Sequence, residues 1–307
     1  MTKNNNPTIL LILGPTATGK SALAIELAKE LNGEIISADS MQVYRGLDIG
    51  TAKPSKEERK SVPHHLIDVK DPDEPWTVSD FTSRANEIIS RLHKEGELPI
   101  IVGGTGLYLN SFLEGYSFPI TEANPALRAR LEKEEAPALW DRLNKVDPEA
   151  AKKISKNDKK RIIRALEVFE GTGKPISKLQ KRSPVAGKYN VIMIGLNTER
   201  EKLYQKINER VDKMIDAGLV DEVKTLLSKG YNRKLTSMQA LGYKEMIDHL
   251  EGKMPLKETI DLMKQKTRNF ARRQMTWFRR FDGVKWFGSE IAIRPEKIRE
   301  YIVNSFK

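Results

Sequence analysis

The chain has 307 residues, 39% hydrophobic and 31% charged, which is enough for one large globular domain or two modest ones. It contains no run near the roughly 18 apolar residues that a membrane-spanning helix needs. It also has no cysteine, which excludes disulfides, thiolate catalysis and cysteine zinc sites. The polar start Met1–Asn6 lacks the basic-then-apolar plan of a signal peptide, so we expect a cytoplasmic protein without a membrane segment. Lys and Arg total 53 against 42 Asp and Glu, a net charge of +11, which favours a polyanionic partner.

The first 114 residues alternate between short apolar runs and helical patterns. The run Thr8–Leu13 is rich in branched residues and lies between Pro7 and Gly14, which is typical of a buried parallel strand. Strand, helix, strand, helix, strand and a short helix are predicted in that order at residues 8–13, 21–31, 34–38, 78–93, 98–102 and 106–113. This alternation predicts an α/β fold in which helices flank a parallel sheet.

The pattern changes between about residues 115 and 188, where charged helical segments dominate. The clearest are Leu127–Leu143 and Asn157–Glu170. A further apolar strand, Val191–Gly195, then resumes the sheet. The rest is mostly helical, with breaks at Gly218, Gly230, Gly242 and Gly252. We therefore predict a core in two parts, residues 1–114 and 189–307, and an all-helical insertion domain at residues 115–188.

One segment matches the pattern G-x-x-x-x-G-K-[ST] between a predicted strand and a predicted helix, as a P-loop does. In a P-loop, backbone N–H groups and the helix N-terminus bind phosphate oxygens. Lys20 adds a positive charge, and Ser21 offers its hydroxyl to a phosphate-bound Mg²⁺. We predict a P-loop NTPase-like fold with a di- or triphosphate site formed by Gly14, Pro15, Thr16, Ala17, Thr18, Gly19, Lys20 and Ser21.

Two more polar residues follow predicted strands and face the same crevice. Asp39 could orient magnesium, act as a base on an acceptor, or serve only as a cap or turn residue. Thr105, between glycines, could donate its hydroxyl to phosphate oxygens or simply belong to a turn. The strand before Thr105 ends without an acid, whereas an ATPase or kinase needs a metal-holding Asp at the end of a second apolar strand.

The surplus of positive charge is concentrated in two segments. Residues 152–182 hold eleven basic and three acidic residues, and residues 264–280 hold seven basic residues and no acid. The second segment also carries Phe270, Trp277 and Phe278. Lys and Arg neutralise phosphates, and aromatic rings stack on unpaired bases. Either segment alone is more typical of a solvated helix face with core aromatics, but two in a P-loop protein favour a nucleic acid as partner.

Several motifs occur in an order that carries a family resemblance. They are Gly14–Ser21, Ile36–Arg45, Asp48–Lys53, Val102–Tyr108, Asn157-Asp158, Arg161–Val168, Ala240–Tyr243 and Arg273–Trp277. This set spans nearly the whole chain and resembles the bacterial tRNA dimethylallyltransferases, also called tRNA isopentenyltransferases. The resemblance implies that the P-loop binds dimethylallyl pyrophosphate, not ATP, with Mg²⁺ as cofactor. It further implies transfer of the prenyl group to N6 of the adenosine just 3′ of the anticodon in tRNA, with release of pyrophosphate. We expect a monomer.

The resemblance also implies roles for single residues. Asp39 is implied as the general base on the adenine amino group, and Thr105, Lys20 and Thr16 as its partners in catalysis. Contacts with tRNA are implied for Asp39, Ser40, Met41, Gln42, Thr105, Arg128, Lys160, Arg161, Arg164, Arg268, Arg272 and Arg273. Gln239 departs from some members of the family, which carry an Arg there that is assigned to the pyrophosphate. Two alternatives remain: an ATP-dependent small-molecule or nucleoside kinase, and a nucleotide-gated RNA-binding protein.

Overall fold

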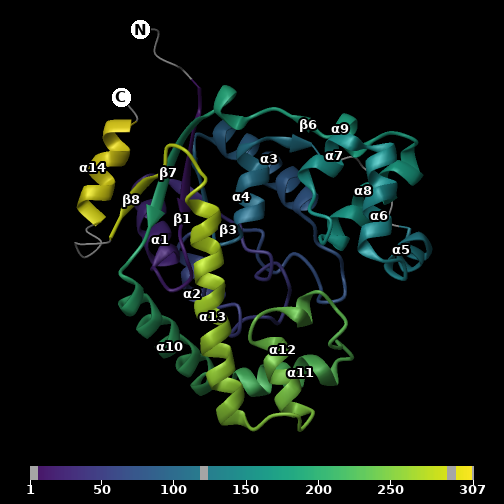
Figure 1. The fold of residues 1–307 in the computed structure, drawn as a ribbon. Helices are drawn as coiled ribbons and strands as arrows, with labels where there is room; N and C mark the ends of the chain where they lie inside the picture. Colours follow the sequence, from purple (N-terminus) through teal and green to yellow (C-terminus); the bar gives the residue numbers. More distant parts are fainter. Residues whose placement is uncertain (1–5, 118–123, 289–294, 306–307) are drawn as a thin grey trace. The chain divides into compact units, whose positions relative to one another are not determined.

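The computed structural model describes residues 6–117, 124–288 and 295–305, so that nearly all of the polar start lies outside the described residues. The chain forms two compact units (Figure 1). The first, here called the core unit, comprises residues 1–113 and 185–307. The second, the insertion unit, comprises residues 114–184. In the described parts of the chain, no helix has the length and apolar character needed to cross a membrane.

The core unit is built on a six-stranded sheet in which every neighbouring pair of strands is parallel. Its order is β3-β2-β4-β1-β7-β8. The strands are β1 (Thr8–Leu13), β2 (Gly33–Ser37), β3 (His64–His65), β4 (Leu98–Gly103), β7 (Asn190–Leu196) and β8 (Lys285–Phe287). The predicted parallel sheet is confirmed. The strands β3 and β8 were not predicted, because two or three residues are too few to show a period of two.

Helices cover both faces of this sheet. Alternate residues of β1 point to opposite faces, as the pleat requires: Leu11 joins one apolar core and Leu10 the other. Leu11 packs with α3 (Val78–Glu95) and α4 (Gly106–Leu113), while Leu10 packs with α1 (Lys20–Glu30) and α14 (Pro295–Ser305). The short α2 (Lys56–Ser61) buries no residue and is held by a capping box at Ser55. The predicted helices on the faces of the sheet are therefore confirmed.

A third apolar core lies among the helices that follow β7. They are α10 (Arg200–Asp216), α11 (Leu219–Ser228), α12 (Tyr243–Leu250) and α13 (Leu256–Phe278). The long α13 is the yellow-green helix in Figure 1. The predicted breaks are confirmed: the four glycines lie between or at the ends of these helices, all with positive φ. Glycine adopts this left-handed conformation without the strain that a Cβ would add.

The insertion unit has its own apolar core around Leu139, Leu143 and Ile162. Its helices are α5 (Pro125–Glu132), α6 (Ala136–Val146), α7 (Pro148–Lys153), α8 (Lys159–Thr172) and α9 (Ile176–Leu179). The segment 127–143, predicted as helical, is divided between α5 and α6, because a new helix begins with Pro137 in its first turn, where proline needs no N–H partner. The unit is also not all-helical, since β5 (Tyr116–Ser117) pairs antiparallel with β6 (Lys181–Arg182) where the chain enters and leaves it.

Candidate active site at the carboxyl edge of the sheet

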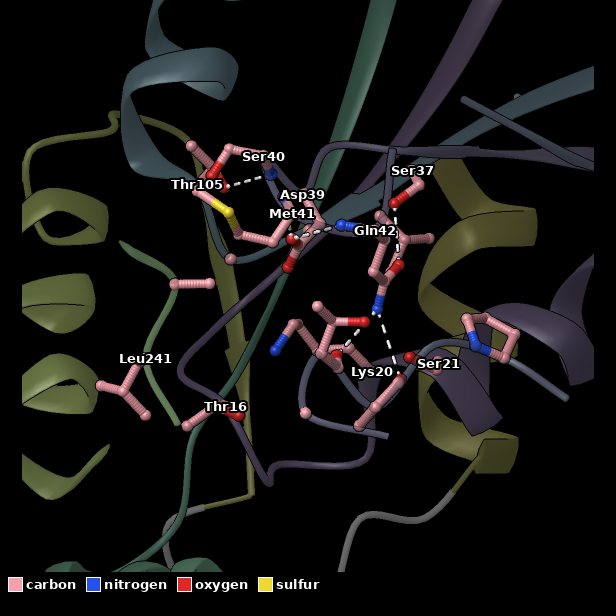
Figure 2. Close-up of a pocket in the computed structure, with 18 of the residues that line it drawn as sticks. Thr16, Lys20, Ser21, Ser37, Asp39, Ser40, Met41, Gln42, Thr105 and Leu241 are labelled. Carbon is pink, nitrogen blue, oxygen red and sulfur yellow. Dashed lines mark hydrogen bonds between the residues drawn. The ribbon is translucent and has the colours of Figure 1, made fainter. Parts of the chain in front are cut away.

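Three neighbouring strands of the core unit end at one cavity of about 310 Å³. Strand β1 leads into the P-loop, β2 into Asp39 and β4 into Thr105, so that loops from three separate parts of the sequence meet. This is the edge of a parallel sheet where ligands bind, because the carboxyl ends of the strands open there. Figure 2 shows Asp39 and Thr105 on one side of the cavity and Lys20 and Thr16 on the other.

The P-loop has a backbone suited to an anion. Ala17 and Gly19 have φ of 64° and 87°, which turns the chain sharply before α1. A Cβ on Gly14 would lie 2.3 Å from the carbonyl oxygen of Leu196, so only glycine fits beside β7. Helix α1 begins at Lys20 without a side-chain cap. Its first N–H groups, together with the helix dipole, are therefore left for an anionic ligand.

Two basic side chains, Lys20 and Arg210, line the cavity. The Lys20 ammonium donates to the carbonyl of Pro15 at 2.8 Å. The pKa of Lys20 is lowered to about 7, chiefly by burial and then by the positive charge of Arg210, against the opposing effect of Asp39. Burial also lowers the pKa of Arg210. In the part of the chain that the structure describes, Arg210 has no hydrogen bond or ion pair. This charge is poorly compensated, so an anion bound here stabilises the site.

Arg210 is a cavity residue that the sequence analysis did not identify. It belongs to α10, far along the chain from the P-loop, and no motif singles it out. Gln239 also lines the cavity, but its side-chain amide donates to the carbonyl of Arg233. The arginine that reaches the cavity is therefore Arg210, and nothing at position 239 adds charge.

The loop after β2 presents one carboxylate. One oxygen of Asp39 accepts from the backbone N–H groups of Met41 at 2.8 Å and Gln42 at 3.2 Å. Its other oxygen has no hydrogen-bond partner among the described residues, and Asp39 is the only acid among those that line the cavity. Nearby, the Thr105 hydroxyl oxygen accepts from the N–H of Ser40 at 3.2 Å. Asp39 is thus both a turn residue and a carboxylate with one oxygen available to a ligand.

The Gln42 side chain is engaged within the protein. Its Oε1 accepts from the Ser37 hydroxyl at 3.0 Å, and its Nε2 donates to the carbonyls of Thr51 and Ala52, both at 3.3 Å. These bonds tie the loop after β2 to the segment that forms another wall of the cavity. Gln42 therefore shapes the cavity in this structure. Met41 is half-buried and packs against the third core.

The residues fit a magnesium ion that arrives with phosphate oxygens. Ser21 is exposed at the cavity, and Asp39 supplies a carboxylate there. No group of three or more His, Asp or Glu that could hold a metal is found within residues 6–117, 124–288 and 295–305. Mg²⁺ usually keeps several waters and takes one or two protein ligands plus substrate phosphates. A hydroxyl with one carboxylate is consistent with that use and not with a dedicated metal cage.

In the insertion unit, most of the predicted tRNA contacts are paired with acids. Arg128 makes two 2.7 Å hydrogen bonds to the buried carboxylate of Glu167, and Arg164 lies 3.7 Å from the same carboxylate. Arg161 pairs with Asp158 at 3.3 Å. By contrast, Lys160 is exposed at the start of α8 and has no partner among the residues that the structure describes.

The three arginines predicted on the last basic segment lie along α13. Arg268 donates to Asn208 at 2.7 Å and lies over the ring of Tyr204. Arg272 donates to Asn269 on its own helix, and Arg273 lies over the ring of Phe270, which is 37% exposed and lines the cavity. The two latter arginines are exposed, so their charges remain available to a partner.

Comparison with known proteins adds independent information. A family model described as IPP transferase matches residues 42–281. A tRNA dimethylallyltransferase from Caldanaerobacter subterraneus subsp. tengcongensis is 51% identical in an alignment of 301 residues that covers 96% of this chain and 96% of that protein. The solved structure of the full-length tRNA isopentenylpyrophosphate transferase from Bacillus halodurans is 45% identical, with a TM-score of 0.73 over 97% of this chain and 96% of that one. A solved eukaryotic dimethylallyltransferase acting on tRNA is 30% identical, with a TM-score of 0.83 over 97% of this chain and 80% of that one. This chain therefore belongs to the tRNA dimethylallyltransferase family, whose domain is also described as IPP transferase.

Proposed function

We propose that this protein transfers the dimethylallyl group from dimethylallyl pyrophosphate to N6 of the adenosine just 3′ of the anticodon in tRNA. The observation that carries the proposal is the arrangement of the cavity. The cavity is lined by two basic side chains, Lys20 of the P-loop and Arg210 of α10, and by a single carboxylate, Asp39, which Figure 2 shows across the cavity from Lys20. Such a cavity suits a reaction in which one group leaves as an anion while another loses a proton.

On the P-loop side, the reaction places charge on the leaving pyrophosphate. As the bond from the prenyl C1 carbon to the pyrophosphate oxygen breaks, the electron pair stays on that oxygen. The loop amides, Lys20 and Arg210 are in place before the reaction and stabilise the charge as it develops. A magnesium ion held by Ser21 and the phosphates would add positive charge there. Thr16 belongs to the P-loop and lines the same cavity, so it would lie near the bond that breaks.

On the other side, the adenine amino group is the nucleophile. A neutral aromatic amine is weak, and it becomes positively charged as the new C–N bond forms. The free oxygen of Asp39 accepts a hydrogen bond from the N6 hydrogens and takes up the proton. Thr105 and Ser40, linked to each other, lie beside it. An adenine inside a stack could not reach this cavity, so the base must be extruded from the anticodon loop.

The basic segments supply the binding of the RNA backbone. Lys160 and Arg161 in the insertion unit, and Arg272 and Arg273 on α13, are exposed positive charges that neutralise phosphates. Phe270 is an exposed aromatic ring at the cavity on which a base can stack. Arg128 and Arg164 contribute less, because each is already paired with Glu167, which competes with the RNA phosphates for the guanidinium group.

The direct test uses an anticodon stem-loop that carries adenosine next to the anticodon. The protein is incubated with the RNA, dimethylallyl pyrophosphate and Mg²⁺, and mass spectrometry looks for one added five-carbon unit. We expect product from the unaltered protein and from Asp261→Asn, an exposed acid on α13 that serves as the control. Asp39→Asn should make little product, because its amide keeps the turn hydrogen bonds but cannot take up the proton.

The same experiment separates the alternatives. No product together with turnover of ATP on a small acceptor would identify a kinase and refute the transferase. Tight RNA binding without product, unchanged in Asp39→Asn, would identify an RNA-binding protein that carries out no transfer.

A further inference from the structure

A single buried side chain joins the two sides of the cavity. Gln274 lies on α13 and is only 5% exposed. Its Oε1 accepts from the backbone N–H of Thr16 in the P-loop at 2.9 Å. Its Nε2 donates to the carbonyl of Gly104, after β4, at 2.9 Å. The sequence motif Arg273–Trp277 contains this residue, but from the sequence functions were assigned only to the basic and aromatic residues around it.

The loop after β4 is shaped to meet this amide. A Cβ on Gly104 would lie 2.2 Å from Nε2 of Gln274. A Cβ on Gly106 would lie 2.7 Å from the Cβ and Cγ of Trp277, one turn along α13. Glycine at both positions lets the backbone approach the helix closely enough for the hydrogen bond to Gln274. The two glycines and Gln274 therefore form one fitted contact, although about 170 residues separate them in the sequence.

From Gly104 the connection continues to the carboxylate side of the cavity. Thr105, the next residue, accepts from the N–H of Ser40, and its own N–H donates to the carbonyl of Ala38 at 3.3 Å. Asp39 lies between these two residues. A chain of hydrogen bonds thus runs from Thr16 through Gln274 to Gly104, and from Thr105 to both neighbours of Asp39.

We propose that Gln274 is a positioning residue that fixes the P-loop relative to Asp39 and Thr105, and so sets the distance between prenyl donor and adenine. The inference rests on the proposed function. Gln274 touches neither substrate; it acts through the two loops that do. Glutamine is suited to this task because its planar amide offers one acceptor and one donor at a fixed separation. Methionine has a similar length but neither group, and asparagine is too short to span the loops.

The expected effect follows from the sensitivity of bond formation to geometry. A displacement of about 1 Å between reacting groups costs about 100-fold in rate, while binding contacts farther away are retained. Loss of Gln274 should therefore lower the rate of prenyl transfer at saturating substrates and leave both KM values near those of the unaltered protein. A residue that only supported the fold would lower the amount of active protein without changing the rate per folded molecule.

The first experiment compares Gln274→Met with Gln265→Met, an exposed glutamine on the same helix. Single-turnover prenyl transfer is measured at saturating stem-loop and dimethylallyl pyrophosphate, and circular dichroism gives the folded fraction at the assay temperature. We expect a rate about 100-fold lower for Gln274→Met at full folded fraction, and an unchanged rate for the control. An unchanged rate in Gln274→Met overturns the inference, whereas absence of product from the unaltered protein overturns the proposed function instead.

A double-mutant cycle tests the contact itself and does not depend on Gln274→Met folding. Gly104 has a backbone conformation that alanine can adopt, so Gly104→Ala acts through its Cβ, which displaces the amide of Gln274. We expect Gly104→Ala to slow transfer strongly when Gln274 is present, but to add little in a Gln274→Ala protein, where the methyl group has room. Independent, additive effects of the two changes would show that the bridge does not control the rate.

Discussion

Lys20 shows how much a single environment changes one residue. A lysine in water is protonated across the physiological range, with a pKa near 10.5, but burial and the charge of Arg210 bring the pKa of Lys20 to about 7. The free protein therefore holds Lys20 partly neutral. A bound pyrophosphate favours the ammonium form and raises this pKa. Affinity for pyrophosphate should be highest below pH 7 and fall as the pH rises above 7.

Calorimetry with inorganic pyrophosphate in buffers of different ionisation enthalpy can detect this linkage as proton uptake on binding above pH 7. The control is Lys20→Arg, because an arginine keeps its charge throughout this range. Pyrophosphate itself exchanges protons equally with both proteins, so the difference between them removes that contribution. We expect more uptake in the unaltered protein than in Lys20→Arg; equal uptake in both would contradict a lowered Lys20 pKa.

Arg210 carries a prediction of its own. Replacing it with glutamine removes a cation from the cavity, so binding of pyrophosphate should weaken by roughly tenfold, the usual loss of a charge-assisted hydrogen bond. The pKa of Lys20 should also rise, because the neighbouring positive charge that lowers it is gone. The proton uptake described above would then shift to higher pH. Arg200→Gln, an exposed arginine at the start of α10, should change neither property.

At the scale of elements, α11 fixes the loop at residues 48–50, which leads into the cavity wall formed by residues 50–52. The Glu222 carboxylate accepts from the N–H groups of Asp48, Ile49 and Gly50 at 3.0, 2.8 and 3.2 Å. It also accepts from the Tyr243 hydroxyl at 2.5 Å, and burial together with this carboxylate raises the pKa of Tyr243. A Cβ on Gly50 would lie 2.4 Å from the tyrosine ring. One carboxylate therefore joins a loop and two helices.

Glu222→Ala leaves three backbone N–H groups and a buried hydroxyl without this acceptor. We expect the free energy of unfolding to fall by about 2 kcal/mol, which is typical of lost hydrogen bonds to a charged group. Urea denaturation measures the change, with Glu300→Ala, an exposed glutamate on α14, as the reference. If both variants lose the same amount, the network around Glu222 does not stabilise the fold.

At the scale of the whole molecule, the affinity for RNA depends more on the excess of positive charge than on single ion pairs. The net charge of +11 attracts RNA, and each phosphate contact releases counterions when it forms. Most arginines of the insertion unit are partly neutralised by acids, such as Arg128 by Glu167. Exposed lysines without a partner, such as Lys160, should therefore account for much of the salt dependence of binding.

This prediction is measurable by fluorescence anisotropy of a labelled anticodon stem-loop over a series of salt concentrations. Lys160→Ala should reduce the slope of log affinity against log salt by about one unit. Lys29→Ala removes an exposed charge from the last turn of α1 and should leave the slope unchanged. An equal decrease in both variants would indicate that affinity follows net charge alone, without a contact at Lys160.

The sequence by itself determined the parallel sheet, the P-loop and the residues that follow the strands. These features are local. An apolar run such as Thr8–Leu13 defines a buried strand, the glycines of the P-loop define its turn, and a residue just after a parallel strand must lie at the carboxyl edge. Asp39 and Thr105 were therefore placed at the same crevice before any tertiary contact was known, and the structure lines one cavity with both.

Only the tertiary structure decided which distant residues complete the cavity. Arg210 and Gln274 reach it because α10 and α13 pack beside the sheet, and Gln274 meets Thr16 across 258 residues of sequence. Three further properties depend on neighbours that only folding brings together. They are the lowered pKa of Lys20, the hydrogen bonds that occupy the Gln42 side chain and the pairing of Arg128 with Glu167. Periodicity reports which face of a segment is apolar. It does not report which other segment that face meets, because packing between elements depends on the shape and charge of all of them together.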